Sequence, residues 1–492
     1  MSRVYKPLNE LTFDNSYLQF PEHFYHRVNP QGLKNAHLIS FNPVVAELLD
    51  LNPCEVTPSQ LAQYFGGGDL LPGSEPIAMK YAGHQFGHYN PSLGDGRGLL
   101  LGEVINSQQE RWDLHLKGAG KTAFSRMGDG KAVLRSSIRE YLVSAAMAGL
   151  GIPTTQALAL VGSETYTMRE GMEPCAQVLR VTQSHIRFGH FEHFYHQRQE
   201  DDLKLLADYC LDRFYASCKQ SDNPYLAMFR AIRDRSLTMV AQWQAYGFVH
   251  GVMNTDNMSI LGETFDYGPY TFMDTFNPDF ISSHTDHEGR YAFKNQPNIM
   301  GWNLSCLAQA LIPLAPKEGL IEALDECGPL YDQYYYETMR RRLGLLTAEE
   351  GDKPLIEQLN TLCAIHKMDR NRFLRDLSDL NPDDDASIQT CLLHAADPTV
   401  LTDWLAAYTN RLDNEAASAP IRQQQMHSVN PVYLLRNYMA EEAIREAQQG
   451  DYRLVNTLLA VLRNPFEEKD EYQHYAGQPP EWAGGICLSC SS

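Results

Sequence analysis

The chain has 492 residues and a mass of 55.7 kDa, with 43% hydrophobic and 21% charged residues. This is ordinary globular composition, which excludes intrinsic disorder, a collagen-like fibre and a small disulfide scaffold. The 41 basic and 61 acidic residues give a net charge of −20, so we expect no nucleic acid partner.

The residue pattern divides the chain into four parts. Residues 1–75 form a mixed N-terminal extension, and residues 76–190 are dense in short strand-like runs and glycine turns. Residues 191–345 are mainly helical around a return to short strands at 248–275, and residues 346–492 form a helical C-terminal extension. We therefore expect an α+β protein with a small β-rich lobe and a large helical lobe.

A glycine-rich segment, Leu93-Gly94-Asp95-Gly96-Arg97-Gly98, leads into a predicted strand at 99–105. Glycines allow backbone N–H groups to approach a phosphate closely, although ordinary turns use the same residues. After a polar turn, the next strand places Leu114 and Leu116 on one face and Lys117 on the other. The segment predicts a phosphate-binding loop followed by a strand that ends in a lysine.

A helix is predicted from about Ser137 to Gly149, and it carries Glu140 in its first turn. Glu140 either forms a capping box with Ser137 or pairs with Lys117 and directs that lysine toward phosphates. The order of glycine loop, strand, lysine strand and glutamate helix is that of the small lobe of protein kinases.

A second polar group follows the apolar pair Phe248-Val249. Asn257 is followed nine residues later by Asp266, and the intervening residues predict a hairpin around Gly262. Kinases hold Mg²⁺ with an Asn and an Asp at the two ends of such a hairpin, whereas the alternative is two polar residues in an ordinary hairpin.

One position inside this segment departs from the kinase pattern. In kinase-like loops an Asp five residues before the metal-binding Asn accepts the proton of the substrate hydroxyl. That position is Val252, which cannot accept a proton, whereas Asp256 stands directly before Asn257. We infer a shifted base and hence a shifted reacting phosphorus, with Asp256 as the catalytic residue.

Basic residues gather in this acidic chain along two stretches, which predicts a local pocket for a polyanion. Taken one at a time, each of them is as well explained as a solvated surface charge. The residues are Lys117, Lys121, Arg126, Lys131, Arg135, Arg180 and Arg187.

Three histidines, His190, His193 and His196, follow one another at three-residue intervals. Because aromatic residues accompany them and no ordered Cys or acidic partners stand nearby, we favour packing or contact with an acceptor over a zinc site.

These motifs resemble the selenoprotein O family of kinase-fold protein adenylyltransferases, and the likeness runs nearly end to end. The segments that carry it are 81–87, 93–97, 116–122, 137–140, 250–257 and Asp266. The closing Cys487-Leu488-Ser489-Cys490-Ser491-Ser492 also resembles the family's tail, in which Cys490 stands where some members carry selenocysteine.

The resemblance implies a kinase-like two-lobed fold in which ATP is bound in a flipped pose, with its α-phosphorus toward the acceptor. It implies that Lys117, Arg180 and Arg187 hold the phosphates, that Glu140 positions Lys117, and that Asp256 is the base. It further implies that the nucleotide is lined by Gly94, Gly96, Arg97, Asp129 and Gly130, and that Asn257 and Asp266, which also contacts nucleotide, bind Mg²⁺ or Mn²⁺.

The implied reaction is attack by a Ser, Thr or Tyr hydroxyl of an acceptor protein on the α-phosphorus, giving AMP-protein and pyrophosphate. UMP transfer from UTP with Mn²⁺, a protein kinase and a catalytically inactive nucleotide-binding scaffold remain as alternatives.

Cys487 and Cys490 form a Cys-x-x-Cys pair near the C-terminal end, which predicts a redox role. The pair either forms a disulfide or remains as two free thiols. In some family members the tail cysteine bonds to a cysteine beyond the Asp-x-Gly segment. Residues 280–284 contain no cysteine here, so that bridge is not expected.

The other eight cysteines are scattered singly, as in reduced cytosolic proteins. The first 20 residues lack the apolar core of a secretory signal, and the longest uncharged run, 141–163, is interrupted by glycines and Pro153. We expect a cytoplasmic monomer that does not enter membranes.

Overall fold

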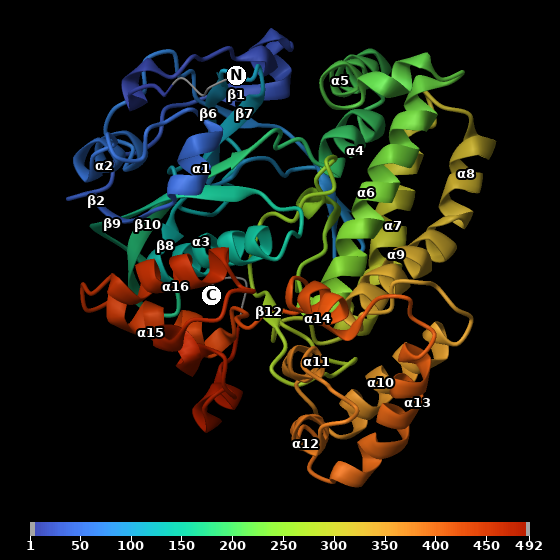
Figure 1. Ribbon diagram of the computed structural model, residues 1–492. Helices are drawn as coiled ribbons and strands as arrows, with labels where there is room; N and C mark the ends of the chain where they lie inside the picture. The colour runs from blue at the N-terminus through green and yellow to red at the C-terminus, as the bar shows by residue number, and fades with distance from the viewer. Residues whose placement is uncertain (1–4, 489–492) are drawn as a thin grey trace.

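The fold was analysed in a computed structural model, which describes residues 5–488 (Figure 1). An eight-stranded antiparallel sheet forms one side of the molecule, in the order β1-β3-β6-β7-β10-β9-β2, with β8 beside β10. Its strands are β1 (Tyr25–Arg27), β2 (His37–Phe41), β3 (Ile77–Met79), β6 (Gly98–Ile105), β7 (Arg111–Lys117), β8 (Ala132–Val133), β9 (Gln156–Met168) and β10 (Met172–Thr182). The first 75 residues thus supply the strands at both ends of the order.

Side chains of the central strands alternate between the two faces of this sheet. On β10, Leu179 belongs to the hydrophobic cluster under α1 (Pro43–Leu48) and α2 (Pro58–Phe65), whereas Val178 belongs to the cluster that contains α3 (Leu134–Gly149). Lys117 lies opposite Val178 in the β7–β10 register. Alternation therefore places Lys117 and Arg180 on the face of the sheet that α3 covers.

Helix α3 begins three residues before the predicted start, so Ser137 lies inside the helix and not at its N-cap. Its Glu140 is directed to Lys117 and Arg180, and the capping-box alternative is therefore wrong. From the C-terminal part, α15 (Asn437–Ala447) and α16 (Arg453–Arg463) pack along α3, as Figure 1 shows in red.

The remaining helices form the other side of the molecule, where α6 packs against α7 and α9 (Figure 1). They are α4 (Phe188–His196), α5 (Glu200–Phe214), α6 (Pro224–Tyr246), α7 (Gln296–Leu311), α8 (Lys317–Asp325), α9 (Cys327–Arg342), α10 (Asp352–Ile365), α11 (Arg370–Leu377), α12 (Asp385–Leu392), α13 (Thr402–Leu412) and α14 (Ala419–His427). The expected combination of a sheet with many helices is confirmed. Within residues 5–488, none of the helices combines the length and apolar character of a membrane span.

Two short strand pairs lie outside the large sheet. They are β4 (Gly83–Gln85) with β5 (His88–Asn90), and β11 (Phe248–Val249) with β12 (Thr271–Phe272). The predicted hairpin around Gly262 is wrong. The Gly262 amide closes a turn onto the Ser259 carbonyl at 3.1 Å, but the residues on its two sides pair with other segments, since Ser259 bridges to Arg187 and Thr264 bridges to Thr154.

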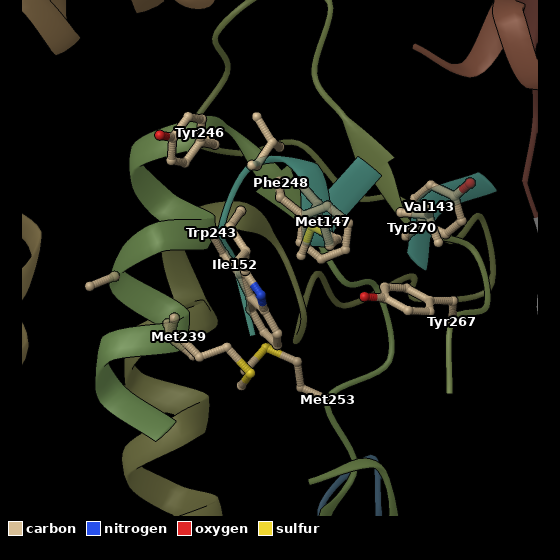
Figure 2. Packing of buried hydrophobic residues seen from close by; sticks show 14 of the residues in the cluster. Val143, Met147, Ile152, Met239, Trp243, Tyr246, Phe248, Met253, Tyr267 and Tyr270 are labelled. Atoms are coloured by element: carbon tan, nitrogen blue, oxygen red, sulfur yellow. The ribbon is translucent and has the colours of Figure 1, made fainter. Parts of the chain in front are cut away.

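A single hydrophobic cluster joins α3 to the helical side. Figure 2 shows Met147 of α3 near Trp243 of α6, Phe248 and Tyr267, all in the same packed region. Arg139 strengthens this junction, because its guanidinium donates to the Tyr270 carbonyl at 2.7 Å and stacks 4.4 Å from the Tyr270 ring. The helix that carries Glu140 is thus fixed to the segment that follows Asp266.

Candidate active site

A cavity of about 530 Å³ lies between the glycine loop, the ends of β7 and β10, and the segment around residues 252–269. The predicted nucleotide, metal and catalytic residues all line it: Gly94, Gly96, Arg97, Lys117, Asp129, Gly130, Arg180, Arg187, Asp256, Asn257 and Asp266. A larger cavity of about 1070 Å³ between α7, α9 and α10 contains none of them. The smaller cavity is therefore the candidate active site, because the charged groups converge there.

An unbroken row of buried ion pairs forms one wall of this cavity. Glu140 bonds to Lys117 and to Arg180, and Arg180 reaches Asp266 at 2.7 Å. Asp266 also pairs with Arg187. The two arginines, Lys117 and Glu140 have side chains no more than 4% exposed, so each charge depends on its neighbour in the row.

Burial and pairing act in opposite directions on these groups. Burial lowers the pKa of Lys117 to about 8, although Glu140 beside it works in the other direction. Burial alone would raise the pKa of Asp266, but Arg187 and Arg180 hold it well below the usual range of a carboxyl. Asp266 is therefore ionised at neutral pH, as a ligand of a cation has to be.

Arg187 is held by two aromatic rings. Its guanidinium lies 4.5 Å from the centre of the Tyr81 ring and 4.6 Å from that of Phe265. It also donates to the backbone carbonyl of Asp256 at 2.9 Å. One cation thus joins Asp266 to the backbone of the proposed base.

Asp256 is buried and incompletely paired. Gln85 donates to one of its carboxylate oxygens at 3.3 Å, and the other, Oδ1, has no hydrogen-bond partner among residues 5–488. Burial raises the pKa of Asp256 to about 7; Arg187 opposes this shift and Asp266 adds to it. A carboxylate with a pKa near neutrality is suited to accept a proton.

The oxygen donors beside Asp256 fit a hard cation. The Asn257 amide donates to the Val252 carbonyl at 2.9 Å, which fixes the side chain, and its amide oxygen is a neutral ligand. Its amide oxygen and the Asp266 carboxylate, which line the same cavity, are oxygen donors of the kind that Mg²⁺ and Mn²⁺ bind.

The glycine loop needs glycine at its first position. Gly94 has a φ of +139°, and a Cβ there would lie 2.5 Å from the Phe124 ring. At the far end of the cavity, Asp129 accepts from Arg169 at 2.8 Å, and this bond and one from Thr167 lower its pKa despite partial burial. Arg169 therefore ties Asp129 to the tip of the β9–β10 hairpin.

Among the cavity groups that sequence reasoning missed are Tyr81, Gln85 and Arg169. Tyr81 and Gln85 belong to a motif already singled out, so the motif itself was the available signal. Arg169 lies 40 residues from Asp129 at a hairpin tip, and nothing in the sequence marks that pairing.

Of the two predicted redox residues, the structure describes Cys487, which does not line the cavity. Cys487 is exposed, and Cys490 lies outside the described residues, so their pairing stays a prediction. The adjacent Leu488 carbonyl accepts from the His284 amide at 3.1 Å and lies 2.6 Å from the His284 ring nitrogen. The tail therefore reaches the segment beyond Asp266 even though that segment has no cysteine.

The three spaced histidines occupy different surroundings. His190 is buried, and its Nδ1 accepts from the Arg187 amide at 3.1 Å, while His193 is buried next to Phe194. His196 lies against Tyr89, with their ring centres 4.0 Å apart. Within residues 5–488 the three do not converge as ligands of one metal ion.

Cations and ionised carboxylates that converge on one cavity of a mixed α/β protein form the class of site that holds a phosphorylated ligand. The family model described as "Protein adenylyltransferase SelO" matches residues 7–463, and the chain belongs to this family. The resemblance drawn from the sequence motifs is thereby confirmed.

Relatives extend the match over the whole chain. The protein nucleotidyltransferase YdiU of Hahella chejuensis (strain KCTC 2396) is 58% identical over 494 residues, covering 100% of both chains. Proteins of the same name from Vibrio vulnificus (strain YJ016) and Pseudomonas fluorescens (strain Pf0-1) are each 49% identical, over 98% and 99% of this chain and 99% and 100% of the relative. The family and its relatives carry names of nucleotidyltransferases, which supports nucleotidyl transfer as the class of activity.

Proposed function

We propose that this protein transfers AMP from ATP to Ser, Thr or Tyr hydroxyls of acceptor proteins and releases pyrophosphate. The observation that carries the proposal is the placement of carboxylates in the cavity. Val252, where a kinase has its base, offers no proton acceptor, whereas the buried Asp256 has a free oxygen and a pKa near neutrality. The carboxylate that remains stands next to Asn257, so the reacting phosphorus is shifted with it.

In this proposal the chain has a kinase-like two-lobed fold. Residues 76–190 are the small lobe and residues 191–345 the large lobe, with residues 1–75 and 346–492 as extensions. The nucleotide lies between the lobes against the glycine loop, and acceptor proteins approach the open side of the same cavity.

Asp256 takes the proton of the acceptor hydroxyl as its oxygen attacks the α-phosphorus. The bond between that phosphorus and the oxygen bridging to the β-phosphorus breaks, and pyrophosphate leaves with the bonding electrons. Lys117, Arg180 and Arg187 stabilise the negative charge that develops on the leaving group. A Mg²⁺ or Mn²⁺ ion held by Asn257 and Asp266 would neutralise further phosphate charge when bound.

The row of ion pairs explains how the arginines stay in place before nucleotide arrives. Arg180 and Arg187 are both paired with Asp266, and Lys117 and Arg180 with Glu140, so three buried cations share two carboxylates. A triphosphate supplies the missing negative charge, and the arginines then contact phosphate oxygens without first being desolvated.

The test is labelling of an acceptor protein with ATP carrying ³²P at either the α or the γ position. We expect label from α-labelled ATP only. Parallel reactions with α-labelled UTP and Mn²⁺ measure the preference between ATP and UTP. Label from γ-labelled ATP would identify a kinase, and absence of label in all arms, with nucleotide binding intact, would identify a scaffold. The Asp256→Asn variant serves as the blank for enzyme-dependent label.

A further inference from the structure

A second polar cluster lies behind the loop that carries Asp256 and does not line the nucleotide cavity. It consists of His84 on β4, Glu192 on α4 and Cys306 on α7, three elements far apart in the sequence. One ligand atom from each, an imidazole nitrogen, a carboxylate oxygen and the thiol sulfur, lie within 4.8 Å of one another. Among residues 5–488 this is the one group of His, Cys, Asp and Glu side chains with that geometry.

The cluster is enclosed and rigidly supported. Glu192 is 1% exposed and Cys306 is 7% exposed. Glu192 lies on α4 and Cys306 on α7, and these two helices pack against each other. Oε2 of Glu192 accepts from the Thr255 hydroxyl at 3.0 Å and lies 3.1 Å from Nδ1 of His84. Its other oxygen, Oε1, is buried without a hydrogen-bond partner among the described residues. A buried carboxylate with an unused oxygen is costly unless a cation or metal pairs with it.

The donor types select the metal. A thiolate and an imidazole are poor ligands for Mg²⁺ and Ca²⁺, whereas sulfur, nitrogen and one carboxylate oxygen together suit Zn²⁺. Glu192 and Cys306 as anions balance the charge of a divalent ion, with His84 neutral. Three protein ligands leave one position of a tetrahedral Zn²⁺ ion for water.

We infer that His84, Glu192 and Cys306 bind one Zn²⁺ ion, which ties β4, α4 and α7 together behind the catalytic loop. On binding, the Cys306 thiol releases its proton to solvent and the sulfur donates an electron pair to the metal. No redox change is involved.

The site connects to the catalytic loop through two hydrogen bonds. The His84 amide donates to the Thr255 hydroxyl at 2.7 Å, and the next residue, Gln85, donates to the Asp256 carboxylate. A metal ion that holds His84 in place therefore also holds Thr255, which precedes Asp256, and the Gln85 amide, which contacts Asp256. The cluster residues act as positioning groups, because none of them lines the cavity.

The experiment titrates metal-free protein with Zn²⁺, and separately with Co²⁺ as a spectroscopic probe, without nucleotide or Mg²⁺. The background carries Cys487→Ser and Cys490→Ser, so that the tail cannot supply thiolates. We expect one Zn²⁺ per chain and a cobalt–thiolate charge-transfer absorption that Cys306→Ser abolishes. Cys327→Ser is the matched control, since Cys327 is also buried, at 9% exposure, on the next-but-one helix; this variant should keep the absorption.

The inference would be overturned if the protein that carries only Cys487→Ser and Cys490→Ser showed no cobalt–thiolate absorption. This outcome does not depend on whether the other variants fold. An absorption that survives Cys306→Ser or disappears equally in Cys327→Ser would also overturn the inference. A second readout is the unfolding temperature, which Zn²⁺ should raise by a few degrees in the parent protein and leave unchanged in His84→Asn. Neither measurement uses nucleotide, so a negative result leaves the proposed AMP transfer untouched, and failure of AMP transfer leaves the metal site untouched.

Discussion

The two walls of the cavity differ in how completely their charges are paired. On the sheet side, Lys117, Arg180 and Arg187 are each bonded to a carboxylate, although all three are almost fully buried. On the loop side, Asp256 is also buried, but it has one oxygen without a partner among the described residues. One wall is therefore saturated with ion pairs, and the other retains an unused acceptor.

This difference separates the groups that bind phosphate from the group that accepts a proton. Paired cations cost little to keep in place and can exchange a carboxylate for a phosphate. An unpaired carboxylate is kept at the expense of stability, and such groups are found where a proton has to be moved. Substitutions on one wall at a time test this difference.

The largest effect is expected from Asp256→Asn, which keeps the shape of the side chain and removes its ability to accept a proton. Turnover should fall by about 10²–10⁴-fold, the range for loss of a general base, while the dissociation constant for ATP stays within about threefold. Initial rates with α-labelled ATP and calorimetric binding measure the two quantities. The exposed Asp279→Asn is the control, and an Asp256→Asn variant with full turnover would remove Asp256 from the reaction.

On the saturated wall, Glu140→Gln should cost about 3–5 kcal/mol of unfolding free energy, because it leaves Lys117 and Arg180 buried with one carboxylate fewer. Urea unfolding followed by circular dichroism gives the value. Glu164→Gln on β9 removes an exposed partner of Lys34 and should change stability by less than about 1 kcal/mol. Equal losses of unfolding free energy in Glu140→Gln and Glu164→Gln would mean that the buried ion pairs contribute no more to stability than an exposed one.

On the unsaturated wall, the same Asp256→Asn variant should be more stable than the parent at pH 8, by about 2–4 kcal/mol. The folded-state pKa of Asp256, about 7, is above that of an unfolded aspartate. Its contribution to stability is therefore complete below about pH 4 and is lost as the pH rises toward 7. Thermal unfolding at pH 4 and pH 8 tests this, and a stabilisation that is the same at both pH values would contradict it.

The smallest effect is on the pH profile of kcat/KM. An ascending limb near pH 7 is expected from deprotonation of Asp256, and a descending limb near pH 8 from loss of the charge on Lys117. Each limb changes the rate by up to about tenfold per pH unit. In Lys117→Arg the descending limb should disappear, because guanidinium stays charged throughout this range. A limb near pH 8 that persists in this variant would belong to another group.

Local patterns in the sequence were enough to predict parts of the sheet side of the cavity. Alternation along 112–117 predicts the face that carries Lys117, because the strand period is a local property. The pairing of Glu140 with Lys117 was one of two alternatives, and the kinase-like order of the elements favoured it. The spacing also predicts that Asp256 replaces the base missing at Val252, and this stays a prediction.

Contacts between distant segments could not be predicted in the same way. Asp266 joins Arg180 and Arg187 across about 80 residues, and the cluster of His84, Glu192 and Cys306 spans three elements. No periodicity links such residues, because the docking of elements places them together. The misplaced hairpin around Gly262 has the same origin: its backbone bonds go to Arg187 and Thr154.

The packing of α16 along α3 has a consequence for control of the enzyme. A Cβ added at Gly149 would lie 2.2 Å from the Leu462 carbonyl, so the two helices touch with no room for a larger residue. Outward rotation of α3 would have to break this contact together with the Arg139–Tyr270 bonds. Inactivation by an outward movement of α3, which carries Glu140, would first require α16 to separate from α3. Control of access to the cavity would break fewer contacts and is the less costly means of regulation.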